Sequence, residues 1–112
     1  MKNGFIELSD TDSLDRFVAE ANGSPVVLLK HSDSCGISAQ AYRDLAKFDG
    51  AVGVITVQRA RALSDEIEKR TGVGHETPQV FILRGGKVLW TASHRQVKTA
   101  AVEAALVEIA EQ

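Results

Sequence analysis

The sequence contains few of the residues that most binding and catalytic sites need. It has one cysteine, Cys35, among 112 residues, which excludes an internal disulfide framework. Its three histidines and single cysteine show no metal-ligand spacing, so we expect no bound metal. No apolar run approaches the roughly 20 residues of a membrane-spanning helix, so we also expect no membrane contact.

An excess of charge of either sign is absent too. The formal net charge of −2 gives no basic surplus for nucleic acid or an anionic membrane. The first residues contain no apolar stretch typical of a signal peptide. With 44% hydrophobic and 25% charged residues, the composition is that of an ordinary globular protein. We therefore expect residues 1–112 to form one domain that works in the reducing cytoplasm, and the sequence gives no oligomeric state.

What the sequence does contain is a regular alternation of apolar patterns. These patterns predict strands over 5–8, 26–30, 51–57, 79–84 and 87–92. They predict helices from an N-cap at Ser9 or Asp10 through Ala21, and over 36–48, 58–71 and 96–111.

The order of these elements is β-α-β-α-β-α-β-β-α, which predicts an α/β fold. Strands that alternate with helices require crossovers and therefore a parallel part of the sheet. Gly85-Gly86 between the last two apolar runs is typical of a hairpin, because its turn needs positive φ. We expect a mixed central sheet with helices on both faces.

Residues 30–38 join the most strand-like run to the start of a helix, and Cys35 stands at that start. Helix N-termini carry unpaired N–H groups and the positive end of the helix dipole. Both favour thiolate over thiol, so Cys35 is predicted to be a redox nucleophile at the carboxyl end of a central strand. The alternative is a buried cysteine that packs as a small hydrophobic side chain.

Ser38 occupies the position where a two-cysteine redox motif carries its second thiol. A serine cannot resolve a mixed disulfide, although its hydroxyl can bind a thiolate one helical turn away. Cys35 would then pass its mixed disulfide to an external thiol, which is monothiol chemistry. The alternative is an ordinary serine on the helix surface.

Charged residues near the predicted nucleophile have two interpretations each. Asp33 is a loop or cap residue that would also oppose a nearby thiolate by like-charge repulsion. His31 and Lys30 would offset that repulsion, or they simply mark the end of the strand. Arg59 can bind a ligand carboxylate, but we expect it to be a charge on a solvated helix.

The element order, with Cys35 opening the second helix and Thr77-Pro78 leading into the hairpin, resembles the thioredoxin fold. More narrowly, four separated segments resemble the monothiol bacilliredoxins, small thioredoxin-like proteins of the bacillithiol redox system. These segments are Lys30-His31-Ser32, Cys35-Gly36-Ile37-Ser38, Gly74-His75-Glu76-Thr77-Pro78-Gln79 and Trp90-Thr91-Ala92-Ser93-His94.

The resemblance implies that Cys35 removes bacillithiol, or a similar low-molecular-weight thiol, from S-thiolated client proteins. Free bacillithiol or a partner redoxin would then restore Cys35, with no tightly bound cofactor. It also implies a cis Thr77–Pro78 peptide that presents backbone groups to a substrate. Together with the patterns above, it gives Cys35 and Ser38 as catalytic residues. The expected substrate-binding residues are Gly36, Ile37, Thr77, Pro78, His75 and His31.

Three further aromatic or imidazole side chains lie in these segments. His75, just before the proposed cis proline, either approaches Cys35 or a bound thiol, or is a solvated loop histidine. His94 follows the last strand and is expected to have a structural role. Trp90 is expected to pack in the core or at the sheet edge.

One motif departs from the family, which usually carries Thr-Cys-Pro-Ile-Ser where this chain has Ser34-Cys35-Gly36-Ile37-Ser38. Gly36 keeps an N–H that a proline lacks and that can bind the thiolate, but it loosens the turn. Two other functions stay open. One is a non-enzymatic adaptor or redox-sensing module. The other is iron–sulfur transfer, because monothiol glutaredoxins carry the similar motif Cys-Gly-Phe-Ser.

Overall fold

The computed structural model describes residues 4–112, so the expectation about the first three residues lies outside it. Its centre is a five-stranded sheet in the order β1-β3-β2-β4-β5. The strands are β1 (Gly4–Glu7), β2 (Val26–His31), β3 (Ala51–Thr56), β4 (Gln79–Arg84) and β5 (Lys87–Ser93). β3 pairs in parallel with β1 and β2, whereas β4 pairs antiparallel with β2 and β5. The expected mixed sheet is confirmed, and β2 lies in the middle of it.

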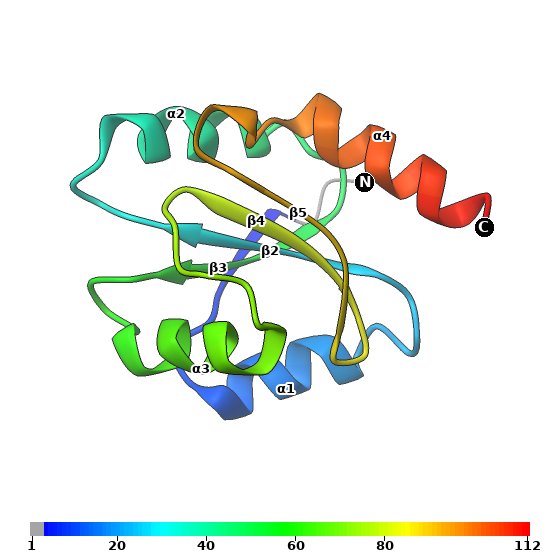
Figure 1. The fold of residues 1–112 in the computed structure, drawn as a ribbon, viewed down its shortest axis with the longest axis horizontal. Helices are drawn as coiled ribbons and strands as arrows, with labels where there is room; N and C mark the ends of the chain where they lie inside the picture. Colours follow the sequence, from blue (N-terminus) through cyan, green and yellow to red (C-terminus); the bar gives the residue numbers. More distant parts are fainter. Residues whose placement is uncertain (1–3) are drawn as a thin grey trace.

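Helices cover both faces of the sheet (Figure 1). α2 (Gly36–Leu45) and α4 (Thr99–Ala110) pack on one face, and α1 (Thr11–Ala19) and α3 (Arg61–Thr71) pack on the other. No helix among residues 4–112 has the length and apolar character needed to cross a bilayer.

The sequence of β2 explains why the sheet is covered twice. All of its residues are buried, and successive side chains of a strand point to opposite faces. Val27 and Leu29 join the core under α2 and α4, whereas Val26 and Leu28 join the core under α1 and α3. The continuous apolar run is therefore that of a central strand buried on both sides.

The first helix begins as the sequence suggested, with Asp10 as its N-cap. The Asp10 carboxylate accepts the Ser13 N–H at 2.8 Å, and the Ser13 hydroxyl oxygen in turn accepts the Asp10 N–H at 3.1 Å. This reciprocal pair is a capping box, which satisfies N–H groups that the helix start leaves free. The hydrogen bond from the Ser13 N–H is the largest cause that lowers the pKa of the Asp10 carboxyl.

Two helices begin later than predicted. α3 starts at Arg61 rather than at residue 58, because the N–H groups of Arg59 and Ala60 both bond to the Thr56 carbonyl and close a turn there. α4 starts at Thr99 rather than at residue 96, because residues 94–96 form a short 3₁₀ helix, η1 (His94–Gln96). Both predicted starts were wrong, and both turns lie at the carboxyl edge of the sheet.

α2 also ends earlier than predicted, at Leu45 instead of residue 48. Phe48 leaves the helix and is buried in the core with Leu45. Its ring lies over Gly50, where a Cβ would be 2.9 Å from Phe48 Cε2, and Gly50 has a φ of +155°. Only glycine suits this tight approach, and the N–H groups of Lys47 and Phe48 bond to the Asp44 and Leu45 carbonyls in turns that do not continue the helix.

Candidate active site around Cys35

Cys35 is held at the junction of the central strand and the second helix. β2 ends at His31, residues 32–34 form a loop, and Cys35 is the N-cap of α2. The backbone carbonyl of Cys35 accepts the Ala39 N–H at 3.0 Å and so begins the helix. Its side chain is partly exposed and makes no capping hydrogen bond. The prediction of its place is confirmed, and the buried alternative is wrong.

Ser38 is not a surface residue, because its exposed fraction is 0%. Its hydroxyl oxygen accepts the backbone N–H of Ser32 at 2.9 Å and lies 2.7 Å from His31 Nδ1. The helix-surface alternative for Ser38 is therefore wrong. Its hydroxyl ties the first turn of α2 to the loop before Cys35 and to the end of β2.

His31 continues this hydrogen-bonded chain toward the surface. Its Nε2 lies 3.3 Å from Asp33 Oδ1, and its ring contacts the ring of Tyr42 at a centroid distance of 4.7 Å. Asp33 in turn accepts a hydrogen bond from Arg59 Nη1 at 3.0 Å. The chain Ser38–His31–Asp33–Arg59 thus runs from the interior below Cys35 to an exposed cation.

Arg59 differs from its prediction, since it lies in the turn before α3 and not on a solvated helix. Besides Asp33, its guanidinium binds Thr56 Oγ1 at 3.1 Å and lies 3.6 Å from Glu7 Oε1. The positive charge beside Asp33 therefore comes from Arg59. Lys30, also predicted as a source of that charge, lies on the other face of the sheet, because side chains alternate along β2.

Gln58 is a site residue that the sequence interpretation missed. Its amide nitrogen donates to Ser32 Oγ at 2.9 Å and to Ser34 Oγ at 3.2 Å, and its oxygen accepts the Asp33 N–H at 3.1 Å. β2 and β3 are parallel neighbours, so the loops after them meet at one edge of the sheet. The position of Gln58, a polar residue directly after the predicted strand 51–57, is the sequence feature that could have indicated this contact.

Lys30 and His75 lie on the α3 side of the sheet. Lys30 is 0% exposed, and its Nζ has no hydrogen-bond partner among residues 4–112. Burial lowers its pKa, against the opposing charges of Glu68 and Asp65. His75 Nδ1 lies 3.4 Å from Ser64 Oγ of α3. Desolvation and then the charge of Lys30 lower the pKa of His75. The approach of His75 to Cys35 or a bound thiol stays a prediction.

The loop of residues 74–78, just before β4, is held by hydrogen bonds at both of its ends. The Thr77–Pro78 peptide is cis, and the Pro78 carbonyl accepts the His94 N–H at 2.8 Å. The Gln79 side chain donates to the Gly74 carbonyl at 2.9 Å, which closes the loop behind Pro78. His94 thus holds the start of η1 against this segment, which agrees with its expected structural role.

Gly36, Ile37 and Thr77 complete the predicted set. Gly36 is exposed and Ile37 is half-buried in the first turn of α2, while Thr77 is half-buried beside the buried Pro78. Nothing lies within 4 Å of a Cβ placed on Gly36, so a larger side chain has room there. Trp90 on β5 packs against the core under α2 and α4, as expected.

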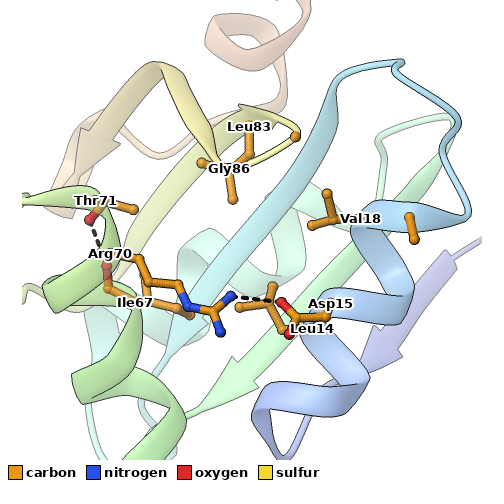
Figure 2. Close-up of a pocket in the computed structure, with 10 residues that line it drawn as sticks. Leu14, Asp15, Val18, Ile67, Arg70, Thr71, Leu83 and Gly86 are labelled. Atoms are coloured by element: carbon orange, nitrogen blue, oxygen red, sulfur yellow. Dashed lines mark hydrogen bonds and ion pairs between the residues drawn. The ribbon is translucent and has the colours of Figure 1, made fainter.

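A separate apolar cavity of about 210 Å³ lies between α1, α3 and the hairpin turn (Figure 2). Leu14, Val18, Ile67 and Leu83 face it, and the Arg70 guanidinium reaches across to Asp15 at 2.6 Å. The hairpin turn is at the opposite end of the sheet from the loop that carries Cys35 (Figure 1). None of the predicted site residues lines this cavity.

The fold and the site define a class of protein, a thioredoxin-like fold with one cysteine at the start of the helix after its central strand. A thioredoxin from Trypanosoma brucei brucei has the same fold, with a TM-score of 0.80 and 12% identity, covering 100% of this chain and 96% of that one. A solved structure described provisionally as an oxidoreductase with a thioredoxin fold has a TM-score of 0.83 and 36% identity. Its match covers 90% of this chain and 92% of that one.

The sequence also matches a narrower family, described as "Monothiol bacilliredoxin BrxC", over residues 6–102. The chain belongs to this family. Family and structural similarity together support a thiol oxidoreductase whose single cysteine is Cys35.

Proposed function

We propose that this protein is a monothiol bacilliredoxin that removes bacillithiol, or a similar low-molecular-weight thiol, from mixed disulfides on cytoplasmic proteins. The observation that carries the proposal is the position of the single cysteine. Cys35 is partly exposed at the start of α2, and a buried serine occupies the place of a resolving thiol. The proposal includes a small thiol as the co-substrate and S-thiolated proteins as the clients.

The proposed reaction has two thiol–disulfide exchanges. First, the Cys35 thiolate attacks the sulfur of the small thiol in the client's mixed disulfide. A new disulfide forms between Cys35 and the small thiol, and the client leaves as a thiolate. Second, a free small-thiol thiolate attacks the small-thiol sulfur of that adduct. It releases the Cys35 thiolate and forms a disulfide of two small thiols, so atoms and electrons balance over the cycle.

The roles of the neighbouring residues follow from their positions. The N–H groups of Gly36 and Ile37 belong to the first turn of α2, where a helix has no acceptors of its own for them. We assign them to the developing charge near Cys35 Sγ. Ser38 positions the loop and the helix from below. The backbone of Thr77 and Pro78, with the side chains of His31 and His75, would form the surface that meets the adduct.

The proposal is tested with a protein that carries one bacillithiol adduct, incubated with the reduced enzyme. We expect mass spectrometry to show loss of the adduct from the client and its appearance on Cys35. Cys35→Ser should abolish the transfer by removing the nucleophile. Circular dichroism should be unchanged, because the Cys35 side chain makes no capping bond.

Ser24→Ala serves as the control, because Ser24 is exposed and lies before β2, at the opposite end of the strand from Cys35. It should retain transfer. A wild-type protein that never acquires the adduct would contradict the proposal. Visible absorbance of the anaerobically purified protein, lost on oxidation, would favour the iron–sulfur alternative instead.

A further inference from the structure

A polar groove of about 310 Å³ begins at the first turn of α2 and runs between α2 and η1. Ile37, two residues after Cys35, lines its near end, and Gln40 and Ala41 continue along α2. Arg95 and Lys98 line the side formed by η1 and the start of α4. The groove therefore starts in the first turn of the helix whose N-cap is Cys35, and it has the size of a small molecule.

The two cations in this groove are available to a ligand. Arg95 and Lys98 are both exposed, and neither has an ion-pair partner among the described residues. This distinguishes them from Arg70 in the apolar cavity, which already binds two carboxylates. Free guanidinium and ammonium groups bind carboxylates through charge-assisted hydrogen bonds.

The acidic groups nearby are already engaged. Asp44, which lines the groove, accepts the backbone N–H of Thr99 at 2.8 Å. Glu76 lies 2.7 Å from Nε2 of His94, another lining residue. These contacts hold both carboxylates against protein donors, and they leave the positive charge of Arg95 and Lys98 for an anion that enters the groove.

The backbone around the two cations is also tied to the rest of the site. His94 has a φ of +56°, in the left-handed region, and its N–H bonds to the Pro78 carbonyl at 2.8 Å. The Val97 N–H then bonds to the His94 carbonyl at 3.2 Å and closes η1. The backbone that carries Arg95 is thus tied to the loop of the cis proline.

We propose that this groove selects a small thiol that carries a carboxylate, with Arg95 and Lys98 as specificity-determining residues. This inference rests on the proposed thiol exchange at Cys35 and names the chemical class of its co-substrate. The Cys35 thiolate attacks the disulfide R–S–S–R′, forms Cys35–S–S–R and releases R′–S⁻. Arg95 and Lys98 bind the carboxylate of the R group that stays on Cys35.

Two chromogenic disulfides test this selectivity on the reduced full-length protein. 5,5′-Dithiobis(2-nitrobenzoate) carries a carboxylate on each half, and 2,2′-dithiodipyridine is neutral, so their rate ratio reports charge recognition. In Arg95→Gln/Lys98→Gln we expect the rate with the anionic disulfide to fall about fivefold at low salt, as for two exposed charge contacts. The rate with the neutral disulfide should stay within about twofold of wild type.

A matched double variant separates the groove from net charge. Arg84→Gln/Lys87→Gln removes the same two charges at the hairpin, where both side chains are exposed and far from Cys35 along the sheet. We expect its rate ratio to equal that of wild type. Thermal unfolding of both double variants checks that they fold, which their surface positions favour.

The possible results separate this inference from the proposed function. Equal loss of the anionic rate in the two double variants would overturn the groove as a binding site, because bulk charge would explain the effect. Reactivity toward both disulfides without any effect of Arg95→Gln/Lys98→Gln would also overturn it, while thiol exchange at Cys35 would stand. Failure of wild-type Cys35 to react with either disulfide would overturn both.

Discussion

Ser38 shows how one buried hydroxyl organises the surroundings of the nucleophile. It accepts the Ser32 N–H and pairs with His31 Nδ1, so both groups depend on it for a partner in the interior. The sequence suggested a direct bond from Ser38 to the Cys35 thiolate. That bond stays a prediction, and the contacts in the structure give Ser38 a role in fixing the loop and the helix that hold Cys35.

We therefore expect Ser38→Ala to destabilise the fold. It leaves a buried N–H and a buried imidazole nitrogen without their partner, which costs about 1 to 3 kcal/mol. Urea unfolding monitored by circular dichroism measures the difference. Ser34→Ala is the control, because Ser34 is exposed and the hydrogen bonds of its hydroxyl with Ser32 Oγ and Gln58 Nε2 are longer, at 3.2 Å each. Equal stability of Ser38→Ala and wild type would show that the buried groups find other partners.

At the scale of the element, β2 carries a polar residue to each face of the sheet at its carboxyl end. His31 faces α2, and both of its ring nitrogens have partners, Ser38 and Asp33. Lys30 faces α3, and its Nζ has no hydrogen-bond partner among residues 4–112. Lys30 lies directly opposite Gln79 of β4, whose Oε1 also has no partner there. A strand buried on both faces thus places in the core under α3 a lysine whose Nζ has no hydrogen-bond partner among the described residues and is balanced only by the charges of Glu68 and Asp65.

The lowered pKa values on this face give stability a definite dependence on pH. Lys30 and His75 both have pKa values below their ordinary 10.5 and 6.5 in the folded protein. Below those ordinary values, the unfolded chain takes up protons that the folded protein resists. Stability should therefore fall as the pH drops through about 6.5 because of His75, and rise as the pH rises toward 10.5 because of Lys30.

Lys30→Met should remove the Lys30 contribution. Replacing a buried unpaired ammonium with an apolar side chain of similar length should raise the free energy of unfolding at pH 7 by about 1 to 3 kcal/mol. The gain should shrink toward pH 10, where the wild-type lysine loses its charge. Urea midpoints at both pH values measure this, with the exposed Lys69→Met as control.

The same variant has a second readout. The charge of Lys30 is one of the causes that lower the pKa of His75, so the pKa of His75 measured by NMR should rise in Lys30→Met. An unchanged His75 titration, or a gain in stability that is the same at pH 7 and pH 10, would contradict the assignment of an ionised Lys30 in this core.

At the scale of the molecule, the sequence predicts those features that depend on local patterns. Alternation of apolar runs predicts the element order, the mixed sheet and the hairpin, because strand and helix periodicities differ. The place of Cys35 follows from a helix that begins directly after a buried strand. These features need no knowledge of distant residues, and the structure has all of them.

The features of the site that the sequence did not predict depend on contacts between segments far apart in the chain. Gln58 and Arg59 read as the start of a helix, but their side chains bind the loop before Cys35, and the helix begins only after the turn they form. The burial of Ser38 and Lys30 is likewise set by the elements that pack over them. Periodicity along the chain carries no signal for such partners.

The close packing of the layers gives a further prediction. Gly53 lies in β3, where a Cβ would be 2.8 Å from Leu8 Cδ1, 2.9 Å from Leu28 Cδ2 and 3.0 Å from Phe17 Cε2. Phe17 belongs to α1, so this glycine allows α1 to lie close to the sheet. Gly53→Ala should destabilise the protein by about 1 to 3 kcal/mol, because a densely packed core resists an added methyl group.

Gly86→Ala in the hairpin provides the matched comparison, because nothing lies within 4 Å of a Cβ at that position. Thermal unfolding should show a lower midpoint for Gly53→Ala and little change for Gly86→Ala. Thiol reactivity of Cys35 should be the same in both folded variants, because β3 contacts α1 at Gly53, on the face of the sheet away from α2. A Gly53→Ala variant as stable as Gly86→Ala would mean that α1 can move outward without cost. The three layers would then be packed less tightly than these distances require.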